Sequence, residues 1–408
     1  MRKTILKKIN LDFFNIILLL FITLLPTQFG KHFFLNFSYI NGVRVDYLTY
    51  VLYTTDVLAL TLIYIKRALI IDFFKNKTVV FVFFLFFLSM FFSISPEVAL
   101  FKFWKIFEVT SLFVIFSKIK IKENLLFLGI FLSCLIELIV AISQFVYQHS
   151  IQGFFYLLGE RYFNSSMPGI AKIVIEGNNF IRPYGTFSHP NSLAGYFLLI
   201  YAFILATNLN KKLLFKNLIL LTSSLLIFIS FSKTAIIAYL AVNIIYLFMK
   251  FKKSECKVCV LSRTFIFSLA SIFFLYSKSD PLSLLKRGVL FKNSIDMLLK
   301  YPITGVGLGN YLIGQAHIKN SVFSLPVQPV HNIFMLFLCE VGIFLGFGIM
   351  YLLFKNFYKY KKSSLFILCF IVFFLTGFFD HYWLTLQQNF LLLGVLFGLI
   401  TNPRVASL

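Results

Sequence analysis

The sequence predicts an all-α polytopic membrane protein with about 12 transmembrane helices. Of its 408 residues, 59% are hydrophobic and 13% are charged, and the mean hydropathy is +0.88. A soluble domain carries about 25% charged residues, so most of this chain is expected to lie in lipid. Because no segment is both long and polar, residues 1–408 are expected to form a single integral membrane domain.

Apolar runs of near-spanning length recur along the whole chain. The first follows MRKTILKKIN and resembles a signal peptide, but it lacks a small-residue cleavage site and further spans follow. We therefore expect an uncleaved first anchor. The expected spans cover residues 11–29, 47–65, 78–95, 98–117, 125–147, 190–207, 214–231, 234–249, 259–276, 331–354, 364–379 and 386–402.

Five basic clusters predict the orientation of these spans. Each follows an even-numbered span, on the same side as the basic N-terminus, and Lys and Arg gather in cytoplasmic loops. Both termini are therefore expected in the cytoplasm. This placement also explains the net charge of +23 without a nucleic-acid partner. The clusters are Lys66-Arg67 with Lys75 and Lys77, KIKIK (118–122), Lys211-Lys212 with Lys216, KFKK (250–253) and KYKK (359–362).

Two long loops, residues 148–189 and 277–330, are expected on the extracytoplasmic side. The second contains LSLLKRGVLFKNSIDMLLKY, whose apolar residues recur with helical spacing. Pro302 ends this helix, and the four glycines of ITGVGLGNYLIG (303–314) predict a tight irregular turn. A helix of this kind at the membrane surface would cover a substrate cavity.

The cysteines do not indicate a disulfide framework. All five lie in or at the ends of apolar runs. Cys256 and Cys259 form a C-x-x-C, but no second pair and no nearby His accompany them. We interpret them as an incidental juxtamembrane pair rather than a zinc or redox site. No P-loop, Rossmann glycine pattern or metal-ligand spacing is present, so neither a metal nor a cofactor is expected.

Cations at the outer ends of spans are the main candidates for a site. Ionisable groups near membrane depth are costly and usually have partners. Arg182 lies in RPYGTFSHPNSLAGYFL (182–198), Lys233 at the tip between two spans, and Arg287 in the second long loop. Several cations at one membrane face predict an anion site, such as one for a lipid phosphate or diphosphate. His331 opens the tenth expected span, and histidine exchanges protons near neutral pH.

Structural roles for the same residues remain open. Arg182 and Lys233 would serve equally as interfacial anchors. His189 precedes Pro190 at a helix start, where it would act as a cap. Within the spans, the buried acids Glu137 and Glu340 are expected to be hydrogen-bonding groups, and Lys105 and Glu108 to neutralise each other.

Three stretches, taken in order, resemble one family. They are residues 182–198, SFSKTAIIAYL (230–240) and the block of residues 287–346 that contains the glycine turn and the His331-Asn332 pair. Together they resemble the O-antigen ligase and O-antigen polymerase superfamily of bacterial envelope glycosyltransferases. The tail FFDHYWLTLQQNFLLLGVLFGLI (378–400) is similar to the C-terminal end of many members. The family-like core covers residues 180–346 and includes the loop 277–330.

The resemblance implies a C-type, inverting, metal-independent glycosyltransferase with its site outside the bacterial cytoplasmic (inner) membrane. Its donor would be an undecaprenyl diphosphate-linked glycan, and its acceptor a sugar or other envelope component. Arg182 and Arg287 would hold the diphosphate, and His331 would orient or deprotonate the acceptor hydroxyl. Where the family has Ser-Arg, this chain has Ser232-Lys233, which keeps the charge but loses the bidentate fork. Secondary site candidates are His189, Glu340, Asp380 and His381.

A transporter is the alternative function, in particular a flippase for lipid-linked oligosaccharides. Such a protein would also be polytopic, basic and aromatic. A flippase is expected to show internal repeats and a charged cavity that opens to both sides. Here the unusual residues and both long loops are expected on the outer side, which favours an enzyme. Ligase and polymerase activities are not distinguished by the sequence.

Overall fold

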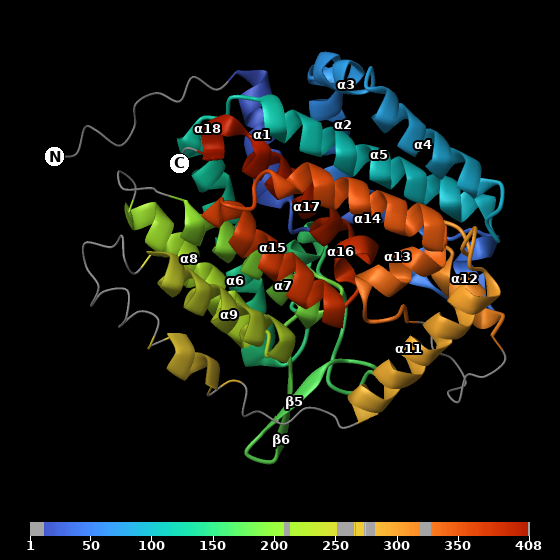
Figure 1. The fold of residues 1–408 in the computed structure, drawn as a ribbon. Coiled ribbons are helices and arrows are strands. Elements are labelled where there is room, and N and C mark those ends of the chain that lie inside the picture. Colours follow the sequence, from blue (N-terminus) through green and yellow to red (C-terminus); the bar gives the residue numbers. More distant parts are fainter. Residues whose placement is uncertain are drawn as a thin grey trace.

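The structure is a computed structural model that describes residues 12–207, 213–250, 265, 267–272, 274, 282–318 and 328–406. These residues form mainly helices, with three small two-stranded antiparallel sheets (Figure 1). The helices are α1 (Phe13–Leu24), α2 (Thr54–Ile65), α3 (Arg67–Phe73), α4 (Lys77–Met90), α5 (Pro96–Lys118), α6 (Glu123–Tyr147), α7 (Pro190–Ala206), α8 (Leu213–Ile229), α9 (Lys233–Lys250), α11 (Leu282–Lys300), α12 (Tyr311–Ala316), α13 (Ile333–Val341), α14 (Ile343–Tyr358), α15 (Ser364–Phe379), α16 (Tyr382–Thr385), α17 (Gln387–Thr401) and α18 (Pro403–Ala406).

The strands pair locally. β1 (Gly30–Phe33) pairs with β4 (Tyr50–Tyr53), β2 (Tyr39–Ile40) with β3 (Val43–Arg44), and β5 (Lys172–Ile175) with β6 (Asn178–Ile181). Three 3-10 turns complete the structure: η1 (Asn36–Ser38), η2 (Asp46–Leu48) and η3 (Gly153–Leu158). The β5–β6 hairpin projects away from the helices (Figure 1). The fold is therefore mostly helical, as expected, although the segments between helices contain short strands that the expected all-α class lacks.

Apolar runs became helices where the sequence predicts them. Every expected span contains one of these helices except the ninth, residues 259–276, of which residues 265, 267–272 and 274 are described and helical. Cys256 and Cys259 lie outside the described residues. Side chains cap several helix starts: Asp12, Asn76, Asn332 and Ser363 each accept a backbone N–H of the first turn. Within the second long loop, α11 covers the segment with helical periodicity.

Two expected spans differ from the helices observed. The tenth run is broken at Gly342, whose φ of +81° ends α13 before α14 begins. There the chain meets the turn that follows α11, and the Ile343 N–H donates to the carbonyl of Pro302 at 2.8 Å. The second run starts its helix only at Thr54, because residues 47–53 form η2 and β4 instead.

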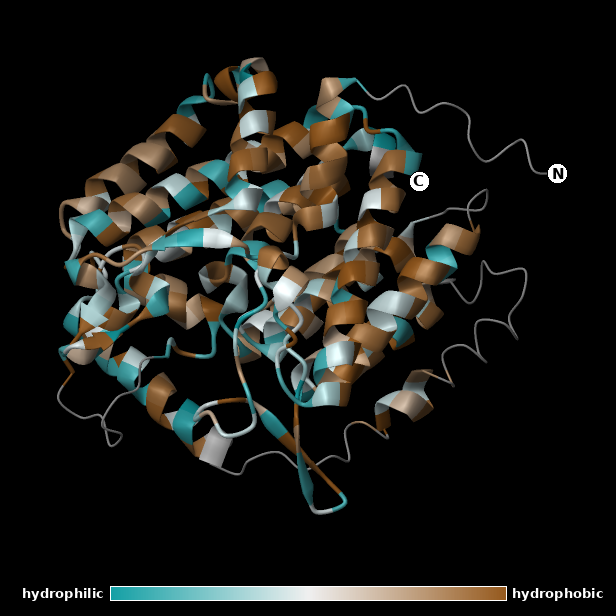
Figure 2. Ribbon diagram, turned by 180° about the vertical axis from the view of Figure 1, so that it is seen from behind, coloured by the Kyte–Doolittle hydropathy of each residue, from teal (hydrophilic) through white to brown (hydrophobic). Residues whose placement is uncertain are grey.

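One described helix, α6, is both long enough and apolar enough to cross a bilayer, by length and composition alone. Nine shorter apolar helices of 10–17 residues accompany it in the described ranges. The helices are predominantly hydrophobic along their lengths, and hydrophilic residues are more frequent in the connecting segments, whereas the β5–β6 hairpin contains both kinds (Figure 2). Twelve spans with two extracytoplasmic loops remain a prediction from the sequence.

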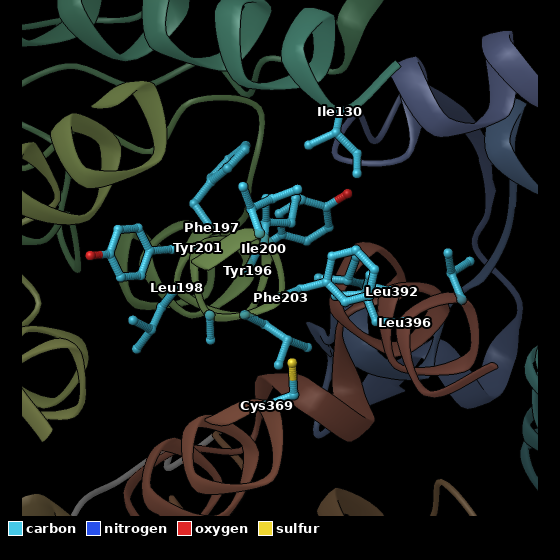
Figure 3. Close-up of a cluster of buried hydrophobic side chains, with 14 of the residues drawn as sticks. Ile130, Tyr196, Phe197, Leu198, Ile200, Tyr201, Phe203, Cys369, Leu392 and Leu396 are labelled. Atoms are coloured by element: carbon cyan, nitrogen blue, oxygen red, sulfur yellow. The ribbon is translucent and has the colours of Figure 1, made fainter. Parts of the chain in front are cut away.

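Helix α7 forms the centre of the hydrophobic core. All 17 of its residues are buried. Tyr196, Phe197 and Tyr201 radiate from it in different directions, and the Tyr201 hydroxyl donates to Asn243 of α9 at 2.7 Å. Cys369 of α15 and Leu392 of α17 pack on other sides (Figure 3). Because α7 begins at Pro190, this packing fixes the position of the polar segment that precedes it.

Helices α5 and α17 pack with their backbones in close contact. A Cβ added at Gly394 would lie 2.6 Å from the carbonyl oxygen of Val109, and one at Gly398 would lie 2.7 Å from that of Phe113. This small-xxx-small spacing lets two helices approach closely, as at interfaces between helices in membranes. This contact fixes α5 relative to α17 and to residues 380–386, which lead into α17. Residues of α5 and of that segment line the cavity of the candidate site.

Three of the basic clusters lie near one end of the helices. Lys118 Nζ lies 3.4 Å from a carboxylate oxygen of Asp72 in α3, which joins the first and second clusters. Asn402 donates to the carbonyl of Ile119, and Tyr360 donates to the carbonyl of Thr401 at 3.4 Å. The C-terminal helix end and the cluster at 359–362 therefore meet this same end, and the cytoplasmic placement of that end remains a prediction.

Candidate functional site

A cavity of about 810 Å³ opens among segments that are far apart in the sequence. Its wall comes from residues 28–53, from α5, from the loop before α7, from His331 and from residues 380–390. The ionisable side chains in the wall, tyrosines aside, are His32, Arg44, Asp46, Lys102, Lys105, Glu160, Arg161, His189, His331, Asp380 and His381.

His331 and Asp380 form a pair at this wall. Nδ1 of His331 lies 3.4 Å from Oδ1 of Asp380, and the two residues precede α13 and α16 respectively. The side chain of Asp380 is 8% exposed and that of His331 is 17% exposed. A carboxylate that holds one ring nitrogen selects the tautomer and leaves the other nitrogen to exchange a proton. The pair therefore has the geometry of a general base with its orienting acid.

Asp380 is held as a carboxylate by several donors. Its Oδ2 accepts the side-chain N–H of Asn191 at 2.9 Å, and its Oδ1 accepts the backbone N–H of His381 at 2.8 Å. Burial alone would raise the pKa of Asp380, but the hydrogen bond and charge of His331 and the nearby His381 outweigh it. The pKa is held well below its usual range, so Asp380 is ionised at neutral pH.

Arg182 is linked to Asp380 through Asn191. Its Nη2 donates to Oδ1 of Asn191 at 2.6 Å, and its Nε donates to the carbonyl of Ser230 at 2.8 Å. Burial lowers the pKa of Arg182 to about 10, which still leaves the guanidinium charged at neutral pH. The sequence alone left two roles open for Arg182, an interfacial anchor and a site residue. The structure places this arginine in the hydrogen-bonded network of the His331–Asp380 pair.

The loop that carries Arg182 is fixed by two side chains of α6. The carboxylate of Glu137 accepts both the backbone N–H and the hydroxyl of Thr186, at 2.9 and 2.5 Å. Oε1 of Gln144 accepts the N–H groups of Tyr184 and Gly185, at 2.9 and 2.8 Å. Gly185 has φ +59°, and a Cβ there would lie 2.3 Å from Glu137. Glu137 is thus the hydrogen-bonding group that the sequence predicts.

Arg287 approaches the same place from α11. Its Nη1 donates to the carbonyl of Phe379, the residue before Asp380, at 3.3 Å. Burial lowers the pKa of Arg182, Tyr184 and Asp380 raise it, and the charge of Arg287 lowers it further. The two guanidinium groups are therefore close enough to interact electrostatically. Arg182, Arg287 and His331 therefore converge on Asp380. Neither arginine lines the cavity, and both reach Asp380 through neighbouring residues.

Lys233 lies at the tip between α8 and α9, which contacts Arg182. It is the first residue of α9, and the tip that carries it contributes the Ser230 carbonyl to Arg182. Phe231 at the tip has φ +52°, which turns the chain sharply between α8 and α9. Lys233 does not line the cavity. The tip is thus adjacent to Arg182, and the assignment of Lys233 to a diphosphate stays a prediction.

The secondary candidates divide between two places. His189 caps α7, since its Nδ1 accepts the Asn191 N–H at 3.1 Å, and it also lines the cavity. His381 lines the cavity too, its ring centroid 5.0 Å from that of His331. Glu340 lies elsewhere, at the far end of α13, where its backbone carbonyl accepts the Gly307 N–H at 2.9 Å. It belongs to the glycine turn and not to the His331 cluster.

Two of the histidines are kept neutral by their surroundings. Burial, followed by the charge of Arg182, lowers the pKa of His189 to about 3. Burial also lowers the pKa of His381 to about 3, against the opposing charge of Asp380. Nδ1 of His381 lies 2.8 Å from the Thr385 hydroxyl, which fixes the ring. Near neutral pH these two imidazoles therefore act as hydrogen-bonding groups.

Three of these side chains also have the spacing of metal ligands. One donor atom from each of His331, Asp380 and His381 lies within 4.8 Å of the other two. In the described part of the chain these are the residues able to share a metal ion. Imidazole nitrogens and a carboxylate are suitable donors for zinc and related ions. The expected metal independence therefore remains a prediction that has to be measured.

The first strand segment supplies cavity residues that the sequence analysis missed. Arg44, Asp46 and Tyr47 line the cavity, and the Tyr47 ring meets that of His381 at 5.8 Å. A signal was present in Asn41-Gly42, whose φ angles of +50° and +77° turn β2 into β3. Asn-Gly between alternating apolar residues is the strongest short hairpin signal.

Residues 218–350, about a third of the chain, match the protein-family model described as O-antigen ligase. The match runs from α8 into α14, so it includes Lys233, Arg287 and His331, whereas Arg182 and Asp380 lie outside it. No curated protein matches the sequence. The match supports the O-antigen ligase and polymerase superfamily and, with it, a glycosyltransferase-like enzyme of ligase type. The family suggests a bacterial inner membrane protein that acts on a lipid-linked glycan and an acceptor.

Proposed function

On the premise that the chain carries an O-antigen ligase domain, we propose that it transfers a glycan from undecaprenyl diphosphate to a sugar or other envelope acceptor. The reaction takes place on the extracytoplasmic side of the inner membrane, at the wall where His331 meets Asp380. The observation that carries this proposal is the connected set Arg182–Asn191–Asp380–His331, with Arg287 beside it. It joins cations suited to a diphosphate with a base suited to a hydroxyl.

His331 acts as the general base. Asp380 holds Nδ1, and the remaining ring nitrogen takes the proton of the acceptor hydroxyl as the oxygen attacks the anomeric carbon of the donor. The bond between that carbon and the diphosphate oxygen breaks, and the diphosphate leaves with the electron pair. A single displacement of this kind inverts the anomeric configuration.

Arg182, Arg287 and Lys233 bind the diphosphate and stabilise the charge that develops on it. Arg182 spends two of its five N–H donors on Ser230 and Asn191, so three remain for phosphate oxygens. Because both protein partners of Arg182 are buried, the guanidinium is positioned before the donor arrives. Pre-positioned cations supply this stabilisation without a metal ion.

A transfer assay with the purified full-length protein in lipid nanodiscs tests the proposal. The substrates are lipid-linked repeat units, with and without a core-oligosaccharide acceptor, and the products are separated by size. A conjugate of repeat and core indicates a ligase, and longer lipid-linked chains indicate a polymerase. His331→Ala should yield neither. Translocation of the lipid-linked sugar across vesicles without a new covalent bond would instead support the flippase.

A further inference from the structure

The β1–β4 pair forms one wall of the cavity. Successive side chains of a strand point to opposite faces of the sheet. His32 and its cross-strand partner Val51 line the cavity, whereas the neighbouring pair, Lys31 and Leu52, does not. Lys31 instead lies over the Phe33 ring, with Nζ 5.7 Å from the ring centroid. The ribbon therefore has a cavity face and an outer face.

Three planar side chains in the cavity wall are stacked together: His32 of β1, Phe34, which follows β1, and Arg44 of β3. The rings of His32 and Phe34 are 5.9 Å apart and inclined by 17°, and the guanidinium carbon of Arg44 lies 4.9 Å from the Phe34 centroid. Nε of Arg44 pairs with Oδ1 of Asp46 at 3.0 Å, and these two side chains are 57% and 48% exposed. We refer to His32, Phe34, Arg44 and Asp46 as the planar stack.

The planar stack offers hydrogen-bond donors and acceptors in fixed positions, and the charges of Arg44 and Asp46 cancel. Arg44 uses one N–H on Asp46, which leaves four donors, and the Asp46 carboxylate retains further acceptor sites. The positive and negative charges compensate each other. Burial lowers the pKa of His32, so its imidazole is neutral near neutral pH and both donates and accepts. Stacking holds these groups in place, which reduces the entropy lost when they bind a ligand.

A polyhydroxylated ring fits this chemistry. Each sugar hydroxyl donates and accepts hydrogen bonds, and the paired guanidinium and carboxylate can serve both roles at adjacent positions. The stack also lies close to the His331 cluster, since Tyr47 follows Asp46 in the chain and its ring meets that of His381 at 5.8 Å. Arg182, Arg287 and Lys233, the residues proposed for the diphosphate, are not part of the cavity wall.

We propose that the planar stack is a subsite for a sugar residue of the acceptor, placed so that an acceptor hydroxyl reaches His331. This inference rests on the proposed glycan transfer, because it divides that site into two parts. The acceptor occupies the cavity, and the donor diphosphate binds on the arginine side of Asp380.

Binding measured without turnover tests the subsite independently of catalysis. Full-length protein in nanodiscs is mixed with a panel of neutral and acidic hexose and heptose oligosaccharides, and saturation transfer to each sugar is recorded by NMR. Arg44→Ala and Asp46→Asn should weaken binding of the best probe about tenfold, as expected for the loss of a charged hydrogen bond. Lys31→Ala, on the outer face of β1, is the control and should bind like the wild type.

His331→Ala separates this inference from the proposed function. It should retain sugar binding while losing transfer. Binding that survives Arg44→Ala in a protein with wild-type thermal stability would overturn the subsite, and so would the lack of binding to any probe in the wild type. If the wild type binds a sugar through Arg44 but makes no transfer product, the subsite stands and the proposed reaction fails.

If the protein catalyses transfer, a comparison of the KM values for the acceptor and for the donor gives a second check. Arg44→Ala should raise the KM for the acceptor about tenfold, with the KM for the lipid-linked donor within twofold of the wild type. Equal rises in both constants would overturn the assignment to the acceptor. Arg44→Lys keeps the charge but not the fork, so it should restore only part of the affinity.

Discussion

Nδ1 of His331 lies 3.4 Å from Oδ1 of Asp380, although the two residues are separated by 49 positions and precede different helices. Asp380 in turn accepts an N–H from Asn191, which accepts one from Arg182. Through this chain a candidate base and a candidate diphosphate ligand share one carboxylate. The variants below separate the roles of these residues.

Removal of either member of the pair should disable transfer. Without an oriented base, His331→Ala and Asp380→Asn are expected to lower kcat about 10²–10⁴-fold, the usual contribution of general base catalysis. Initial rates of transfer in nanodiscs provide the measurement. Glu176→Gln, at the exposed turn of the β5–β6 hairpin, serves as the carboxylate control and should keep the wild-type rate. Wild-type rates in both cluster variants would contradict the proposed site.

Arg287 should be sensitive to geometry as well as to charge. Arg287→Ala is expected to abolish transfer while membrane insertion is retained. Arg287→Lys should lose about tenfold, because lysine keeps the charge but gives up one of two charge-assisted hydrogen bonds. Donor KM and kcat are measured for both variants, with the neighbouring exposed Lys286→Ala as control. Full activity of Arg287→Ala would exclude this residue from the diphosphate site.

Acid should destabilise the folded protein through its neutral histidines. The pKa of His189 and that of His381 are lowered to about 3, against about 6.5 in an unfolded chain, so between these values only the unfolded state binds the protons. Stability is thus complete above about pH 6.5 and falls as the pH drops, by about 1.4 kcal/mol per unit for each histidine. Asp380, whose pKa is lowered, adds a loss only below its ordinary value near 3.8.

Thermal midpoints between pH 4.5 and 7.5 measure this dependence. His189→Asn keeps a capping side chain but removes one titrating group, so the slope should decrease. The exposed His149→Asn is the control and should leave the slope unchanged. Identical slopes for His189→Asn and the wild type would mean that His189 does not carry the effect.

The contact of Glu137 with the loop before α7 can be tested at two glycines with similar backbone conformations. Gly185 and Gly177 have φ of +59° and +83°, but an added Cβ meets Glu137 at 2.3 Å in the first case and nothing within 4 Å in the second. Gly185→Ala should therefore destabilise the protein more than Gly177→Ala, by about 1–3 kcal/mol beyond the shared strain, since it disturbs a buried acceptor. Equal shifts in thermal midpoint would show that the contact with Glu137 is unimportant.

Removal of metal ions by a chelator distinguishes two roles for His331, a general base and a metal ligand together with Asp380 and His381. If His331 acts as a base, treatment with EDTA followed by dialysis should leave the transfer rate unchanged. The donor atoms of His331, Asp380 and His381 lie within 4.8 Å of one another, so a metal effect would also have a structural basis there. Loss of activity that Zn²⁺ or Mn²⁺ restores would replace the proposed base with a metal centre.

Most helices could be predicted because each depends on a local property, the length and apolarity of a run. Their boundaries were accurate to a few residues, as in α6 and α15. The break at Gly342 could not be predicted from the run itself, because it depends on contact with the turn after α11. The strands of residues 30–53 were missed. β1, β2 and β3 lie between the first two expected spans, where the Asn41-Gly42 turn signal was overlooked, and β4 lies in the apolar run 47–65, which was interpreted as entirely helical.

The sequence by itself determined which residues are unusual in this apolar chain. Arg182, Arg287, His331 and Asp380 are distinct by residue type and by position at or outside the ends of the expected spans, and these properties require no tertiary information. Only the tertiary structure decided that His331 and, through Asn191, Arg182 meet at the carboxylate of Asp380 with Arg287 beside it, that Glu340 belongs to another place, and that the β1–β4 ribbon faces the same cavity. The physical reason is that hydrogen bonds act over about 3 Å, whereas these residues are brought that close only by helices packed from distant parts of the chain.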